Sequence, residues 1–178
     1  MNYDKIHIFG ASGSGTTTLA KALCAVSSYV HFDSDDYFWK IKYSLPWPRE
    51  MRLQTLEAAL QKERAWILSG AVIDWGNPLI PLFDAVIFLS VPNEERISRL
   101  MDREKRRYGS ETEQGGARHR EFTEFIDWAK LYEAGGMDVR SRLQQETWLE
   151  TIRCPVLRIE GAQPVEETYE IAREFLLG

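Results

Sequence analysis

Short apolar runs alternate with longer amphipathic segments along the chain. The apolar runs have the length of buried strands and cover residues 5–9, 29–32, 65–69, 85–89 and 155–159. The amphipathic segments repeat apolar positions every three or four residues and predict helices at 17–26, 50–64, 93–107, 121–133, 138–150 and 164–178. Strands that alternate with helices predict an α/β fold, in which helices cover both faces of a parallel sheet. Ligands of such sheets bind at the carboxyl ends of the strands.

The segment between the first strand and the first helix is rich in glycine. It reads GASGSGTT over residues 10–17, which is the pattern G-x-x-x-x-G-K-[S/T] with Thr16 at the lysine position. Backbone N–H groups of such a loop surround an anion, and the next helix adds its positive end. We therefore predict a phosphate site in which Thr17 offers its hydroxyl to Mg²⁺; a flexible Gly/Ser turn is the alternative. The predicted nucleotide-binding residues of this segment are Gly10, Ser12, Gly13, Ser14, Gly15, Thr16, Thr17 and Thr18.

Three carboxylates follow the second predicted strand. Asp33, Asp35 and Asp36 lie where that strand ends, beside the predicted phosphate loop. Phosphoryl transfer uses carboxylates there to hold Mg²⁺ and to orient the attacking hydroxyl. Alternation along an extended chain would send Asp33 and Asp35 to the same side. Helix capping is the alternative, with Ser34 as the N-cap and the next two acids in the first turn.

Arginines recur along the predicted 93–107 helix. At 100° per residue they share one side of the helix, beside a buried apolar stripe. These arginines are Arg96, Arg99, Arg103, Arg106 and Arg107. Guanidinium groups suit phosphates because each can bind two oxygens. The polar segment at 104–120, which includes Arg118 and Arg120, predicts a short lid over a nucleotide, whereas a solvated cationic face is the alternative.

Composition narrows the class of protein. The chain has 178 residues, a length that suits one domain, and its apolar fraction of 44% indicates a globular protein. A net charge of −5 argues against a general nucleic-acid-binding protein. Cys24 and Cys154 lack metal-ligand spacing and are expected to be reduced core thiols. We find no signal peptide and no long apolar span, so we expect a cytoplasmic protein, a monomer or homodimer with small-molecule partners and no membrane partner.

Together these motifs resemble the small P-loop kinases, the group that includes adenylate, shikimate and gluconate kinases. The likeness covers nearly the whole chain. It implies a three-layer P-loop NTPase fold with a five-stranded parallel sheet in the order 2-3-1-4-5. The runs GASGSGTTTL, FDSDDYFW and W-x-L-S-G also look like a group of bacterial P-loop proteins known only as "AAA family ATPase" or adenylate kinase-like.

The resemblance implies roles for several residues. Asp33-Ser34-Asp35 is similar to the DxD of shikimate kinases, which implies a Mg²⁺-associated Asp33 and an Asp35 that contacts the substrate hydroxyl. The run Val91-Pro92-x-Glu94, followed by Arg99 and Arg103, is similar to that of adenylate kinases. This likeness implies Arg99 against adenine and Arg103 at the phosphates, with residues 161–164 as the loop that lines the base. We expect Arg107 to act with Arg103 in catalysis.

Thr16 departs from the kinase pattern. The missing lysine normally touches the β- and γ-phosphates, so its loss is expected to cost about 3 kcal/mol unless another cation replaces it. An arginine of the lid is the first candidate, and Lys21 is the second.

The predicted acceptor-binding region covers residues 36–64 and the end of the third strand. We expect Asp36, Arg52, Gly70 and Trp75 to contact the acceptor, because aromatic rings with arginine suit a planar or acidic molecule. Ordinary core packing of the aromatics is the alternative.

Three functions are compatible with these motifs. The first is a kinase that uses ATP and Mg²⁺ to phosphorylate a small metabolite, nucleoside or nucleotide. The second is a nucleotide-binding regulator or weak NTPase, impaired by the loss of the lysine. The third is an interaction scaffold that binds no nucleotide.

Overall fold

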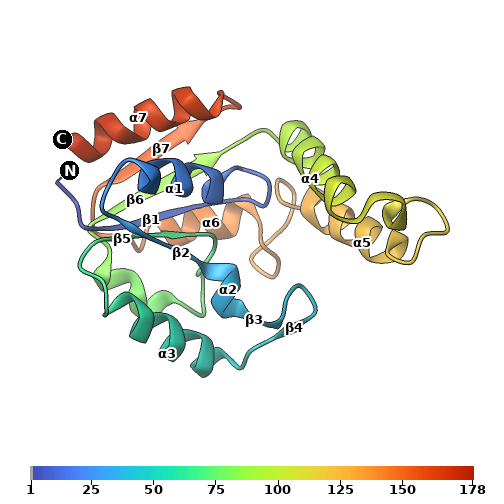
Figure 1. Cartoon of the computed structure of the whole chain (residues 1–178), viewed down its shortest axis with the longest axis horizontal. Coiled ribbons are helices and arrows are strands. Elements are labelled where there is room, and N and C mark those ends of the chain that lie inside the picture. Colours follow the sequence, from blue (N-terminus) through green and yellow to red (C-terminus); the bar gives the residue numbers. More distant parts are fainter. Residues whose placement is uncertain (1) are drawn as a thin grey trace.

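The computed structural model describes residues 2–178 and contains a five-stranded parallel sheet (Figure 1). Its strands, in spatial order, are β2 (Val30–Asp33), β5 (Trp66–Ser69), β1 (Lys5–Gly10), β6 (Ala85–Ser90) and β7 (Val156–Glu160). Counted within this sheet alone, the order is the expected 2-3-1-4-5. The labels read 2-5-1-6-7 because a separate antiparallel hairpin, β3 (Trp39–Ile41) with β4 (Leu45–Pro46), was not predicted.

Helices cover both faces of the sheet, as predicted. One face packs against α1 (Thr16–Ala25) and α7 (Val165–Leu177). The other face packs against α3 (Arg49–Leu60), the 3₁₀ helix η1 (Asn77–Leu82) and α6 (Arg142–Leu149). Figure 1 shows α1 and α7 above the sheet and α3 below it.

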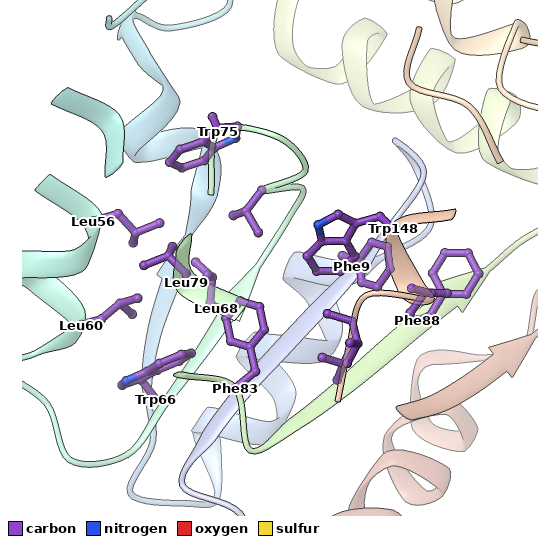
Figure 2. Packing of buried hydrophobic residues seen from close by; sticks show 14 residues of the cluster. Phe9, Leu56, Leu60, Trp66, Leu68, Trp75, Leu79, Phe83, Phe88 and Trp148 are labelled. Carbon is purple, nitrogen blue, oxygen red and sulfur yellow. The ribbon is translucent and has the colours of Figure 1, made fainter. Parts of the chain in front are cut away.

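Alternation along β1 divides its side chains between the two cores. Ile6 and Ile8 point to the α1–α7 side, whereas Phe9 points to the other side. There Phe9 lies 5.0 Å from the ring of Trp148 and 4.9 Å from that of Phe88, measured between ring centroids (Figure 2). These buried aromatic contacts fix β1, and therefore the loop that follows it, in the centre of the sheet.

A helical arm projects from the sheet (Figure 1). It consists of α4 (Asn93–Tyr108), the 3₁₀ turn η2 (Gly109–Thr112) and α5 (His119–Lys130). Leu100, Ile126 and Ala129 form a small core of its own. The segment predicted as a lid at 104–120 therefore comprises the end of α4, η2 and the approach to α5.

Several predicted helix ends move by a few residues. α2 (Ser34–Phe38) begins at Ser34 with Asp33 as its N-cap, so the expected Ser34 cap is wrong by one residue. The helix expected from 138 begins at Arg142, where Ser141 accepts a hydrogen bond from the Gln144 N–H and caps it. Within residues 2–178, no helix has both the length and the apolar character needed to cross a membrane.

Candidate functional site

A cavity of about 830 Å³ opens at the carboxyl ends of β1, β2 and β5. The glycine loop, α2 and the β3–β4 hairpin line it, and α4 and α5 of the arm complete its wall. The cavity thus lies where parallel sheets bind ligands, and its size is typical of a small-molecule site.

The glycine loop is closely packed on its outer side. A Cβ on Gly10 would lie 2.4 Å from the Leu89 carbonyl oxygen, and one on Gly13 would lie 2.7 Å from the Arg96 carbonyl oxygen. Gly13 and Gly15 also have positive φ angles of 86° and 97°, which favour glycine. The structure therefore requires glycine at these positions for the loop to curl tightly between β1 and α1.

The first turn of α1 offers uncapped N–H groups to the cavity. Its N-cap is Gly15, which makes no side-chain cap, and the first turn contains no acid. The first intrahelical bond runs from the Leu19 N–H to the Gly15 carbonyl oxygen, at 2.9 Å. The N–H groups of residues 16–18 therefore have no intrahelical acceptor, which suits an anion.

The predicted loop residues divide into three groups. Gly10, Ser12, Gly13, Thr16 and Thr17 line the cavity. Ser14 lines a second, much smaller pocket of about 20 Å³. Gly15 and Thr18 line neither pocket, because Gly15 forms the helix cap and Thr18 is exposed to solvent.

Asp33 joins the loop to α2. Its Oδ2 accepts a hydrogen bond from the Thr17 hydroxyl at 3.1 Å, and its Oδ1 accepts one from the Asp35 N–H at 3.0 Å. A hydroxyl and a carboxylate side by side are ligands that fit Mg²⁺, which needs only one or two protein carboxylates when phosphates supply the rest. Within residues 2–178 no cluster of three His, Cys, Asp or Glu residues forms a metal cage. A Mg²⁺ ion held here would therefore need further ligands, such as phosphate oxygens.

Asp35 lies in the same cavity and is partly buried. Burial, together with the nearby Asp33 carboxylate, raises the pKa of Asp35. The cations Arg140, Lys42 and Arg103 oppose this rise. The extended geometry that would align Asp33 with Asp35 ends at Ser34; the two residues share the cavity because one caps α2 and the other lies in its first turn.

Arg140 was missed by the sequence analysis. Its side chain lines the cavity, and its guanidinium carbon lies 5.6 Å from the centroid of the Trp128 ring. Burial lowers the pKa of Arg140, and Asp35 counteracts this effect. Arg140 lies within the helix predicted at 138–150, which in the structure begins only at Arg142, and the only sequence signal for a loop there is the preceding Gly135-Gly136 pair.

The arginines of α4 do not share one environment, contrary to the predicted stripe. Arg103 and Arg107 line the cavity, and both contact Glu104, at 3.1 and 3.4 Å. Arg118 lines it too, whereas Arg120 is exposed on α5. The α4 helix turns its residues to different neighbours because the glycine loop packs on its first turn and α5 on its later turns.

Arg99 lies beside the small pocket, away from the main cavity. This pocket also contains Ser14, Gly161 and Gln163, so the structure brings Arg99 next to the loop at 161–164. Arg99 also forms an ion pair with Glu95 at 2.8 Å, which the sequence analysis did not include.

Of the residues predicted to bind the acceptor, only Gly70 lines the main cavity. Asp36 instead pairs with Lys42 at 2.7 Å. The Arg52 guanidinium stacks on Phe38, 3.9 Å from the ring centroid. Trp75 is only 5% exposed and packs in the core with α3 and η1, so core packing is the correct interpretation for this tryptophan.

Aromatic side chains also line the cavity, and three of them, Phe38, Trp39 and Tyr43, belong to the predicted acceptor-binding region at 36–64, whereas those of α5 were not predicted. Two groups face it, one from α2 and the hairpin and one from α5. They are Phe38, Trp39, Tyr43, Phe122, Phe125 and Trp128. Thr16 faces the same cavity, whereas Lys21 does not line it and is exposed on α1, which removes the structural basis for Lys21 as the replacement cation.

Comparison with known proteins places the fold and the family. No protein-family profile matches the chain. A shikimate kinase from Bacteroides thetaiotaomicron superposes with a TM-score of 0.58 at 17% identity, over 99% of both chains. A deoxyadenosine kinase from M. mycoides with bound dATP gives a TM-score of 0.57 at 16% identity, over 98% of this chain and 100% of that one.

One relative is much closer in sequence. The "Uncharacterized protein YqaC" of Bacillus subtilis (strain 168) is 42% identical over 171 residues, which are 96% of each chain. Two chains with this identity along nearly their full length share the same fold. The chain therefore belongs to the family of YqaC, and it has the fold of the P-loop small-molecule kinases.

Proposed function

We propose that the protein is a Mg²⁺-dependent kinase that transfers the γ-phosphoryl group of ATP to a small metabolite, nucleoside or nucleotide. One observation carries the proposal. The glycine loop, the Thr17–Asp33 pair and Asp35 open into a single cavity that four arginines also line. These arginines are Arg103, Arg107, Arg118 and Arg140.

Each group has a task that suits phosphoryl transfer. The loop amides and the first turn of α1 bind the phosphates of the donor. Thr17 and Asp33 would hold Mg²⁺, which would neutralise phosphate charge. The arginines stabilise negative charge on the transferring group, as transition-state donors do in this reaction class.

Asp35 orients the acceptor and takes its proton. Its raised pKa makes the carboxylate a stronger base than an exposed aspartate, which favours removal of the acceptor's hydroxyl proton. Arg140 lies close enough to act on Asp35 electrostatically, and it contributes positive charge at the acceptor side of the cavity. The aromatic walls suit a planar acceptor, and the arginines that line the same cavity suit an acidic one.

Titration and label transfer test the proposal. Wild-type protein is titrated with ATP and with GTP in magnesium buffer, then incubated with γ-labelled ATP and a panel of metabolites. We expect Asp35→Asn to reduce transfer by at least about 100-fold and to change nucleotide affinity by less than about twofold. Asp102→Asn, at an exposed position of α4, is the matched control.

The outcomes separate the hypotheses. Labelled product that disappears in Asp35→Asn supports the kinase. Nucleotide binding without any labelled product supports the nucleotide-binding regulator. If the protein binds neither ATP nor GTP, the kinase hypothesis is refuted and the interaction-scaffold hypothesis remains.

A further inference from the structure

Arg96 lies behind the glycine loop and is almost completely buried, with 1% of its surface exposed. It occupies the first turn of α4, and its Nη1 donates a hydrogen bond to the Ser12 carbonyl oxygen at 3.0 Å. Its Nη2 donates to Asn93 Oδ1 at 2.6 Å, and its guanidinium carbon lies 4.6 Å from the centroid of the Tyr132 ring. Three different elements thus hold this guanidinium in one position.

The contact with Ser12 fixes the direction of a loop amide. In a trans peptide the carbonyl of one residue and the N–H of the next point in opposite directions. Because the Ser12 carbonyl points outward to Arg96, the Gly13 N–H is aimed the other way. Gly13 lines the cavity, so this N–H is directed toward the predicted phosphate site.

The charge of Arg96 has no carboxylate in ion-pair contact: Glu133 acts on it only through space and itself pairs with Arg142 at 3.7 Å. Among residues 2–178, no Asp or Glu oxygen lies within the 4.0 Å of an ion pair with it, whereas Arg99, Arg103 and Arg107 each have such a partner. Removing a cation from water without a counter-ion costs free energy. An anion bound in the loop would reduce that cost, because only one peptide unit separates the guanidinium from the loop interior.

We infer that Arg96 replaces the absent loop lysine from behind: it orients the Gly13 amide and supplies the buried positive charge that Thr16 cannot supply. Arg96 is a positioning residue, since Ser12 lies between it and the phosphates. The inference deepens the proposed function and rests on it. It also differs from the expectation that a lid arginine fills this role.

Affinity for Mg²⁺-tripolyphosphate, a probe without a base, tests the inference. We expect Arg96→Met to raise its Kd by at least about tenfold, which corresponds to about 1.4 kcal/mol. Arg106→Met, which changes an exposed arginine of the same helix, is the control and is expected to stay within about twofold of wild type. Because Arg96 is buried, its substitution could disturb folding, so Asn93→Ala, which removes only the hydrogen bond to Nη2, is a second and milder variant. Circular dichroism tests whether each variant is folded.

Rescue distinguishes a positioning role from general damage. Thr16→Lys added to Arg96→Met is expected to restore most of the lost affinity, while Thr16→Lys alone is expected to gain much less. A merely structural defect would not be repaired by a lysine on the opposite side of the loop. The inference is overturned if Arg96→Met and Asn93→Ala both bind Mg²⁺-tripolyphosphate within about twofold of wild type. It is also overturned if the double variant Thr16→Lys/Arg96→Met binds the probe no more tightly than Arg96→Met.

Hydrogen exchange separates this inference from the proposed function. Without ligand, Arg96→Met is expected to speed amide exchange in a peptide that covers residues 10–17, relative to wild type and Arg106→Met. Unchanged exchange overturns the inference. Wild-type protein that binds neither tripolyphosphate nor ATP refutes the proposed function instead, and the exchange result still decides whether Arg96 orders the loop.

Discussion

His7 lies in the middle of β1, fully buried, three residues before the glycine loop. Its Nδ1 is 3.0 Å from the Leu68 carbonyl oxygen, which can only accept, so the proton is on Nδ1 and Nε2 is bare. The ring stacks on Phe83 at 4.8 Å and on Phe9 at 5.4 Å between centroids. Burial lowers the pKa of His7 from 6.5 to about 4, only partly opposed by the hydrogen bond to Leu68.

This lowered pKa makes stability depend on pH. Between about pH 4 and 6.5 the unfolded chain binds a proton at His7 and the folded chain does not. The contribution of His7 to the free energy of unfolding is therefore constant above pH 6.5 and falls as the pH drops toward 4. The gap between the two pKa values corresponds to a loss of about 3 kcal/mol, a large part of the stability of a small domain.

Urea denaturation at several pH values measures this effect. His7→Gln keeps an N–H donor for Leu68 but cannot titrate, so its free energy of unfolding should fall less with acid than that of wild type. The packing cost of the substitution is the same at each pH and cancels in the comparison. Parallel curves for the two proteins between about pH 7 and pH 4.5 would refute the reasoning.

Two further predictions concern the site. Asp35→Asn is expected to raise the melting temperature at about pH 7, because the raised pKa of Asp35 means that its ionised form destabilises the fold; thermal denaturation should show this gain shrinking as the pH falls toward about 4. Gly13→Ala is expected to lower the free energy of unfolding, measured by urea denaturation, more than Gly15→Ala does. A positive φ costs each variant roughly 1–3 kcal/mol, and Gly13→Ala should lose more than that. The reason is that a Cβ on Gly13 would lie 2.7 Å from the Arg96 carbonyl oxygen, whereas one on Gly15 has nothing within 4 Å; equal losses would contradict it.

The strands of the sheet could be predicted well because strands that are buried on both faces consist of continuous apolar residues. Continuous apolar runs such as 85–89 mark strands, and glycine and acidic residues mark their carboxyl ends. Those ends meet at one edge in a parallel sheet, which explains why Asp33 and the glycine loop were correctly expected to be neighbours. The 39–46 hairpin was missed although residues 39–45 alternate apolar and polar side chains, because its strands are only three and two residues long and mostly exposed.

Side-chain partners were less predictable than elements. An arginine on an amphipathic helix is expected in solvent, and nothing in the spacing of Arg96 reveals that a loop 84 residues earlier offers it a carbonyl. Trp75 shows the opposite error, since an aromatic residue after a strand suits a pocket wall as well as a core. Long-range contacts of this kind depend on how loops close over the sheet, and local periodicity carries no information about that.

The cations of α4 differ in how firmly their part of the helix is attached to the sheet. Gly10 pairs with Leu89 near the end of β6, and α4 begins three residues after that strand ends, so the first turn of α4 is fixed to the sheet that carries the loop. Arg107 lies eleven positions further along, about 16 Å away at the helical rise, on an arm whose core is separate from the sheet. Arg96 can therefore serve as a constant charge behind the loop, whereas Arg107 follows any movement of the arm. If the arm moves to admit an acceptor, Arg96 would therefore keep the Gly13 amide in place, a task that a lysine in the loop would otherwise have to perform alone.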